Sequence, residues 1–211
     1  MKILFYGDSI TEMGRRYDDS CEAFNYGVGF PLFIAGELGS RNPDKYRIIN
    51  RGVGGNKSVD LYSRLKADVW NHQPDVINIL GGVNDLWHDI DLNIGVEIDR
   101  FERVFGWILK ETKERLPNAK IIICEPFVLK GVNTQAQWEK FAALKDYAKV
   151  LEKLANEYSA HFLPLQEKFS DLAKKYGAEK YLYDGVHTTP VGAKLIADEW
   201  LKLFDEKIDI Y

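Results

Sequence analysis

Residues 2–11 read Lys-Ile-Leu-Phe-Tyr-Gly-Asp-Ser-Ile-Thr, an apolar run followed at once by a glycine and two small polar residues. The apolar run predicts a buried strand over residues 2–7, and the glycine allows the chain to turn sharply after it. In an open parallel sheet, ligands bind at the carboxyl ends of the strands. Ser9 is therefore placed where its hydroxyl can act as a nucleophile, although Gly, Asp and Ser also serve as plain turn residues at strand ends.

Near the other end of the chain, residues 184–190 read Asp-Gly-Val-His-Thr-Thr-Pro. A serine becomes a strong nucleophile when a base takes its proton, and the base needs a third group that fixes its tautomer. His187 and Asp184 can fill these two roles toward Ser9. The Thr-Pro pair predicts the start of a final helix at Pro190. An aspartate three residues before a histidine also occurs by accident, so this motif alone leaves a surface role open.

Two glycine-rich segments follow predicted strands in the middle of the chain. Residues 50–56 read Asn-Arg-Gly-Val-Gly-Gly-Asn, and residues 80–85 read Leu-Gly-Gly-Val-Asn-Asp. Acyl transfer builds negative charge on a carbonyl oxygen, which preorganised N–H donors stabilise. The backbone of Gly55 and the side-chain amide of Asn84 can supply such donors. For either segment in isolation, simple turning of the backbone explains the glycines equally well.

Short β-rich runs alternate with helical patterns along the whole chain. Strands are predicted at residues 2–7, 46–50, 75–81, 119–124 and 161–164. Apolar residues recur at helical spacing between them, at Leu61, Leu65 and Val69, at Phe101, Val104, Phe105 and Ile108, at Phe141, Leu144, Ala148 and Leu151, and at Leu195, Ile196, Trp200 and Leu203. This alternation predicts a single α/β domain over residues 1–211, a three-layer α/β/α sandwich of the flavodoxin-like type with a five-stranded parallel sheet.

Composition agrees with a compact, soluble enzyme. The 211 residues are 45% hydrophobic, and the formal net charge of −4 with interspersed signs argues against nucleic acid or an anionic membrane as partner. The first predicted strand begins at Lys2 without an export signal before it, and no apolar run reaches membrane-spanning length, so we expect a cytoplasmic protein. Cys21 and Cys124 are expected to be free thiols, and neither a metal nor a cofactor is predicted. The sequence leaves open whether the protein forms a homo-oligomer.

The remaining histidines and the tryptophans receive mostly structural interpretations. His72 and His161 are expected to be structural, whereas His88 either lines the site or lies in a solvated loop. Trp87, close to Asn84, can stack on a pyranose ring or belong to the core. The other tryptophans are assigned to packing, at positions Trp70, Trp107, Trp138 and Trp200.

The order of these features resembles that of the SGNH or GDSL-like hydrolase family. The features are a serine after the first strand, a glycine after the second, an asparagine after the third and an Asp-x-x-His segment before the last helix. The resemblance extends to intracellular acetylxylan esterases through Gly-Asp-Ser-Ile-Thr-x-x-Gly-Arg at residues 7–15, Asn-x-Gly-Val-x-Gly-Asn at residues 50–56 and Gly-Val-Asn-Asp-x-Trp at residues 82–87. Thr188 departs from that pattern, because those esterases usually have proline there.

The resemblance implies a serine esterase that forms an acyl-enzyme. Ser9 is then the nucleophile and an oxyanion donor through its N–H, Gly55 and Asn84 are the further donors, and Asp184 and His187 complete the triad. An acetylated sugar, above all a xylo-oligosaccharide, is the expected small-molecule substrate. The polar segment over residues 13–30 supports a sugar, because it is not an apolar lid for an acyl chain. Candidate substrate contacts are Asp8, Arg15, Tyr26 and Trp87.

Three other functions are compatible with parts of this pattern. The first alternative is a lipolytic acylhydrolase, which covers lysophospholipases, thioesterases and broad short-chain esterases. The second is a flavodoxin-like module that binds flavin or phosphate, which the long charged segment after the first strand disfavours. The third is a carbohydrate-binding protein without catalysis, which the complete set of nucleophile, base, acid and oxyanion donors disfavours.

Overall fold

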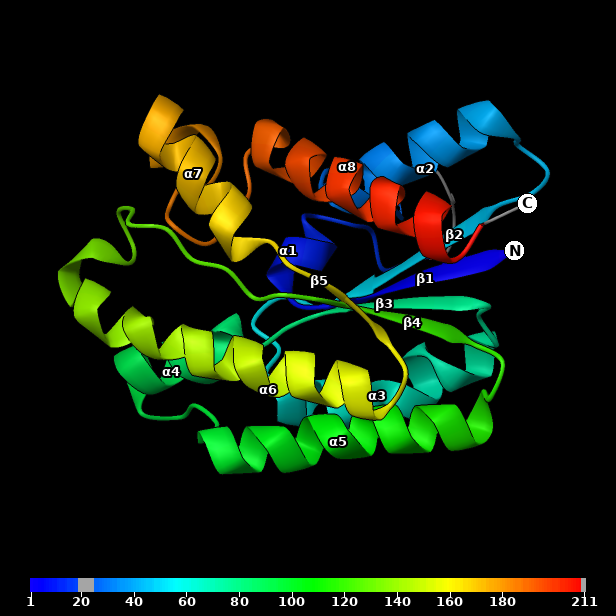
Figure 1. Ribbon diagram of the computed structural model, residues 1–211, viewed down its shortest axis with the longest axis horizontal. Coiled ribbons are helices and arrows are strands. Elements are labelled where there is room, and N and C mark those ends of the chain that lie inside the picture. Colours follow the sequence, from blue (N-terminus) through cyan, green and yellow to red (C-terminus); the bar gives the residue numbers. More distant parts are fainter. Residues whose placement is uncertain (19–24, 210–211) are drawn as a thin grey trace.

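The computed structural model describes residues 1–18 and 25–209, and a parallel sheet forms its centre (Figure 1). The strand order is β2-β1-β3-β4-β5, the order of flavodoxin-like doubly wound sheets. The strands are β1 (Lys2–Gly7), β2 (Arg47–Gly52), β3 (Val76–Leu80), β4 (Lys120–Cys124) and β5 (His161–Leu163). The predicted five-stranded parallel sheet is confirmed, and each strand lies within two residues of its expected bounds.

Helices cover both faces of the sheet (Figure 1). One face carries α2 (Phe30–Arg41), α7 (Gln166–Tyr176) and α8 (Pro190–Lys207). The other face carries α3 (Ser58–Asp68), α5 (Ile98–Arg115) and α6 (Leu144–Glu157). Shorter elements lie in the connections, namely α1 (Ser9–Glu12), η2 (Trp70–His72), α4 (Val83–Leu92), η3 (Gln135–Ala143) and η4 (Ala178–Lys180).

The predicted apolar spacings fall on α3, α5, α6 and α8, and most of the residues that they name are buried. All four α5 positions of the pattern are buried, from Phe101 to Ile108. Phe141 is buried too, but it belongs to η3, because the chain kinks before α6 begins at Leu144. The packing assignment is wrong for Trp107, which is 48% exposed and only leans on the ring of Tyr62 at 5.8 Å.

Trp200 ties the last helix to the sheet. Its side chain is fully buried in α8, and its Nε1–H donates to Oδ1 of Asn78 on β3 at 3.0 Å. The same oxygen accepts from Sγ of Cys124, a buried free thiol on β4, at 3.1 Å. The other cysteine, Cys21, falls outside the described residues. A buried polar group needs a partner, so this network fixes α8 against β3 and thereby the loop that precedes α8.

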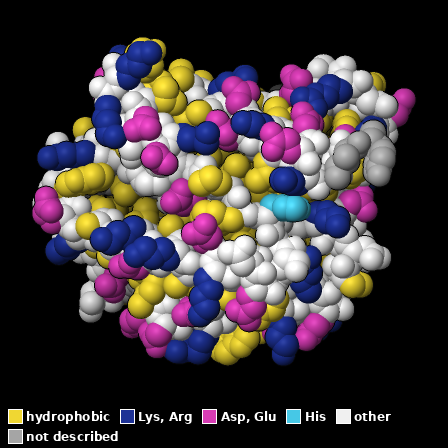
Figure 2. All heavy atoms as spheres, in the orientation of Figure 1, with side chains coloured by type: hydrophobic (Ala, Val, Ile, Leu, Met, Phe, Trp, Pro, Cys, Tyr) yellow, Lys and Arg dark blue, Asp and Glu magenta, His cyan; other side chains and the backbone are white. Residues whose placement is uncertain are grey.

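Side chains of both charge signs are interspersed over the face seen in Figure 2, without an extended patch of one sign. Within the described part of the chain, none of the helices combines the length and the apolar character that a membrane crossing requires.

Candidate active site

The candidate site forms at the carboxyl ends of the three neighbouring strands β2, β1 and β3. Gly7, the last residue of β1, pairs in register with Gly52 and Leu80, so the segments that follow these strands start side by side. A Cβ atom at Gly7 would lie 2.3 Å from the carbonyl oxygen of Leu80 and 2.4 Å from Oγ1 of Thr11. Only glycine permits this close approach, which brings Ser9 to the sheet edge.

Ser9, His187 and Asp184, the predicted triad, form one hydrogen-bonded chain. Oγ of Ser9 lies 2.9 Å from Nε2 of His187, and Nδ1 of His187 lies 2.7 Å from Oδ2 of Asp184. The serine comes from the start of α1 and the other two residues from the loop before α8, where His187 lies 178 residues after Ser9. This arrangement lets the imidazole take the hydroxyl proton at Nε2 while Nδ1–H donates to the carboxylate.

The Asp184 carboxylate is almost completely enclosed and fully engaged. Oδ1 accepts from the backbone N–H of Val186 at 2.9 Å and of His187 at 2.7 Å, and Oδ2 also accepts from Nδ2 of Asn133 at 3.1 Å. Burial raises the pKa of this carboxyl, but hydrogen bonds, first from the His187 ring and then from these backbone groups, outweigh it and lower the pKa to about 2. Asp184 is therefore ionised throughout the neutral range.

The Asp184 carboxylate changes the pKa of the His187 imidazole. The hydrogen bond to Asp184 raises the pKa of His187, burial opposes the rise, and the negative charges of Asp184 and Asp8 add to it. The rings of Trp87 and Tyr183 both pack near the His187 ring, with centroid distances of 6.0 Å and 5.8 Å, and the Tyr183 ring is nearly parallel to it, at an interplanar angle of 17°. His187 is thus held by packing as well as by its carboxylate.

The expected oxyanion donors Gly55 and Asn84 lie in the segments that follow β2 and β3, the two strands on either side of β1. Gly55 has a φ of +74°, a left-handed conformation that favours glycine, in the loop after β2. Nδ2 of Asn84, in the first turn of α4, donates one N–H to the carbonyl oxygen of Asn56 at 3.1 Å, which ties the asparagine to that loop. A primary amide has two N–H groups, so the second one stays available for a substrate oxygen.

A family model described as GDSL-like Lipase/Acylhydrolase matches residues 5–195, nearly the whole chain. The chain belongs to this family. It is accordingly a carboxylic ester hydrolase, and the function implied by the sequence resemblance is confirmed at this level.

Several proteins of this kind share the sequence and the fold. An acetylxylan esterase of Geobacillus stearothermophilus is 30% identical over 207 residues, which cover 95% of this chain and 92% of the relative. The solved structure of an acetylxylan esterase from the same species matches with a TM-score of 0.85 at 29% identity, covering 95% and 92% of the two chains. A protein assigned as a GDSL-like lipase from Parabacteroides merdae matches with a TM-score of 0.90 at 35% identity, covering 95% and 94%.

The four candidate substrate contacts occupy different environments. Trp87 is half-buried beside His187, whereas Tyr26 packs on the core and its carbonyl oxygen accepts from Nδ2 of Asn50. Asp8 is fully buried, and its Oδ1 caps α1 by accepting from the N–H of Ile10 at 2.9 Å. Arg15 is 6% exposed, and its Nε–H donates to the carbonyl oxygen of Gly52 at 2.8 Å. The structure therefore brings Trp87 to the site and gives Asp8 and Arg15 internal positions.

The other histidines lie largely as expected. His72, in η2, accepts from Nε of Arg51 at 3.1 Å, and His161 begins β5. His88 is on α4, one turn after Asn84, and its Cε1 lies 3.8 Å from the place that a Cβ of Gly55 would occupy. The loop of residues 53–57, which follows β2 and carries Gly55, is called the oxyanion loop below. Of the two interpretations of His88, the structure supports a side chain that borders this loop.

The sequence patterns gave no role to three neighbours of the site, although two of them are adjacent to predicted site residues. Asp85 follows Asn84, and Tyr183 precedes Asp184, so position alone was a usable signal. For Asn133 the sequence offered no such signal, because this residue approaches Asp184 from the loop after β4. Both oxygens of the buried Asp85 accept from the N–H of Ser58, and Oδ1 also accepts from its hydroxyl at 2.5 Å. Asp85 thereby anchors the start of α3 and the loop that carries Gly55.

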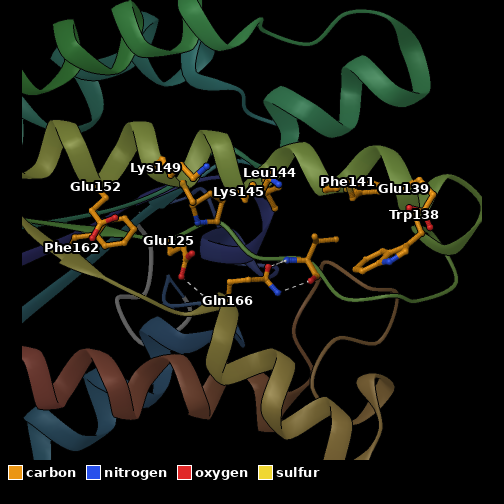
Figure 3. A pocket seen from close by; sticks show the side chains of 14 residues that line it. Glu125, Trp138, Glu139, Phe141, Leu144, Lys145, Lys149, Glu152, Phe162 and Gln166 are labelled. Carbon is orange, nitrogen blue, oxygen red and sulfur yellow. Dashed lines mark hydrogen bonds between the residues drawn. The ribbon is translucent and has the colours of Figure 1, made fainter.

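Figure 3 shows a pocket next to α6. It has a volume of about 430 Å³ between α6, the segment after β4 and the start of α7, with Trp138, Phe141 and Phe162 among its apolar side chains. Gln166 closes one wall by exchanging hydrogen bonds with the backbone N–H and carbonyl oxygen of Val128 at 2.9 and 3.0 Å. The described residues that line it include no member of the triad.

Over residues 1–18 and 25–209, no three His, Cys, Asp or Glu side chains come together as metal ligands would. The residues at the site match acid–base and nucleophilic chemistry, and a reaction without metal or cofactor stays a prediction.

Asn84→Ala is expected to lower kcat about 10²–10³-fold with a smaller effect on KM, because the amide contacts the oxyanion more strongly than the ground-state carbonyl. Steady-state kinetics on a short acyl ester measures both parameters. Asn156→Ala, an exposed change on α6, serves as the control. A loss confined to KM would instead place Asn84 in ground-state binding.

The kcat/KM profile is expected to fall on acidification, because only neutral His187 accepts the Ser9 proton. Since the pKa of His187 is raised above its ordinary 6.5, the midpoint of this acidic limb should lie above pH 6.5. An NMR titration of the His187 ring should give the same midpoint. A limb below pH 6.5, or a different ring pKa, would assign the profile to another group.

Proposed function

We propose that this hydrolase removes acetyl groups from short xylo-oligosaccharides or closely related acetylated sugars. The observation that carries the proposal is the chain from Ser9 Oγ through His187 to Asp184, at 2.9 and 2.7 Å. The acetylxylan esterase relative, similar over almost its whole length, supports the substrate class. The aromatic rings of Trp87 and Tyr183 beside His187 suit the apolar faces of a pyranose.

In the proposed reaction, His187 takes the proton as Ser9 Oγ attacks the acetyl carbonyl carbon. The tetrahedral oxyanion accepts from the N–H groups of Ser9 and Gly55 and from the free N–H of Asn84. Collapse breaks the bond to the sugar oxygen, which receives the proton from His187 and leaves as a hydroxyl. A water then attacks the acetyl-serine with His187 again as base, which releases acetate and restores the hydroxyl of Ser9.

The lipolytic alternative requires an apolar channel that leads a long acyl chain to Ser9. The apolar pocket next to α6 does not supply one, since the triad is not part of its lining. Around His187 the side chains are aromatic or polar instead. These features favour a small acetyl group over a long chain.

A substrate panel tests the assignment. Acetylated xylo-oligosaccharides should be cleaved faster than other esters, and p-nitrophenyl acetate much faster than its butyryl and octanoyl homologues, because a small pocket excludes longer chains sterically. A chelator should leave every rate unchanged. Faster hydrolysis of octanoyl esters or lysophospholipids than of acetylated xylose oligomers would overturn the proposal in favour of the lipolytic alternative.

A cytoplasmic location and the oligomeric state stay predictions, to be tested by fractionation and light scattering.

A further inference from the structure

The mechanism leaves one carboxylate at the nucleophile unused. Glu12 follows Ser9 by three residues at the end of α1, so both side chains lie on the same side of this short helix. A Cβ atom at Gly54, in the loop after β2, would lie 2.8 Å from Oε2 of Glu12 and 3.8 Å from Cβ of Ser9. The carboxylate and the nucleophile thus border the same point on the surface of the oxyanion loop.

The position of this carboxylate is fixed by a chain of contacts. Oε1 of Glu12 accepts from the hydroxyl of Tyr17 at 2.9 Å, and the guanidinium of Arg15 lies 4.0 Å from the centroid of the Tyr17 ring. Arg15 is itself held by its bond to the carbonyl oxygen of Gly52, at the end of β2. The charge therefore has a defined place relative to the sheet edge.

Glu12 also keeps most of its hydrogen-bonding capacity. A carboxylate has about four lone-pair sites, and the hydroxyl of Tyr17 occupies one of them. Within the described residues, no lysine or arginine lies at ion-pair distance from Glu12. Beside the nucleophile, Glu12 is thus a negatively charged acceptor that a bound ester can reach.

We propose that Glu12 determines which esters the site accepts: it binds hydroxyl groups of a neutral leaving group and repels esters that carry a negative charge. The first half of this inference rests on the proposed sugar deacetylation. Hydrogen bonds from a hydroxyl to a carboxylate are about twice as strong as those between neutral groups, which favours a polyhydroxylated leaving group. The second half follows from Coulomb repulsion alone and holds for any ester.

The charge arm of the test uses two aryl acetates, methyl 4-acetoxybenzoate, which is neutral, and 4-acetoxybenzoate, which is anionic. Wild-type protein should show the higher kcat/KM on the neutral ester. Glu12→Gln keeps the size of the side chain and removes its charge, and it should shrink the neutral-to-anionic ratio about three- to tenfold. High salt should shrink the wild-type ratio as well, because it screens the repulsion. Comparison of one ratio between variants cancels the intrinsic reactivity of the two esters.

The hydroxyl arm compares acetylated xylobiose with methyl 4-acetoxybenzoate. Glu12→Gln should lower the sugar-to-aryl ratio of kcat/KM about tenfold, mainly through the KM for the sugar. Tyr17→Phe, which keeps the carboxylate but removes the hydrogen bond that positions it, should act in the same direction and more weakly. Glu114→Gln, an exposed change near the end of α5, is the matched control and should alter neither ratio. Circular dichroism verifies the fold of each variant.

Glu12→Gln ratios equal to those of Glu114→Gln in both arms would overturn the inference. If wild-type protein cleaves the aryl acetates but no acetylated xylose oligomer, the sugar proposal and the hydroxyl half fail, while the charge arm still decides whether Glu12 repels anions. If the sugar is cleaved and neither ratio responds to Glu12→Gln, Glu12 is excluded and the deacetylase proposal stands.

Discussion

Replacing Ser9 with alanine is expected to lower kcat about 10⁴–10⁶-fold, the largest effect of any single substitution in this protein. Without Oγ, no acyl-enzyme can form, and the oxyanion donors can only assist a direct attack by water. The fold should persist, because the lost contact is one hydrogen bond to His187, worth about 0.5–1.5 kcal/mol of the free energy of unfolding.

Kinetics on the best ester, together with thermal unfolding, measures both parts of this expectation. Ser63→Ala, an exposed serine on α3, is the matched control and should behave like the wild type. A properly folded Ser9→Ala protein that keeps near wild-type turnover would remove Ser9 as the nucleophile.

Asp184→Asn should lower kcat about 10⁴-fold. An asparagine can still accept from the N–H groups of Val186 and His187 through its oxygen, so the loop should keep its shape. Its NH₂ group would then face Nδ1 of the His187 ring and favour the tautomer that carries the proton on Nε2. That nitrogen could no longer accept the proton of Ser9.

The pH profile provides a readout that a merely structural role of Asp184 would not affect. Asp184 raises the pKa of His187, so its replacement should move the acidic limb of kcat/KM to lower pH while the plateau falls. Asp171→Asn, an exposed aspartate paired with Lys174 on α7, should change neither. An unmoved limb with an intact plateau would exclude Asp184 from the triad.

The strands illustrate what local pattern can predict. β1 was expected at residues 2–7 and is found at Lys2–Gly7, because a run that is buried on both faces of a parallel sheet is apolar throughout. Apolar spacing predicted α3, α5, α6 and α8, with the exception of the kink before Leu144, but no pattern was assigned to α2, α4 or α7. Trp107 was misjudged because spacing identifies a hydrophobic residue but not the surface that will cover it.

The site shows the limit of such patterns. The four short segments containing Ser9, Gly55, Asn84 and Asp184 with His187 could be located, since each carries chemically distinctive residues after a strand or before a helix. The burial of Asp8 and Arg15 could not be predicted, because burial depends on long-range packing; Arg15, for example, donates to the carbonyl oxygen of Gly52 at the end of β2. Asn133 was equally inaccessible, since its loop meets Asp184 only in the folded chain.

By itself, the sequence determined the strand and helix periodicities, the fold class and the residues able to perform acyl transfer, because these properties depend on side-chain chemistry and short-range spacing. Only the tertiary structure decided which groups touch. The bond between Ser9 and His187 spans 178 residues, and the Glu12 carboxylate reaches the edge of the oxyanion loop through the packing of two strand ends. Contacts of this kind arise from long-range packing, which no local pattern encodes.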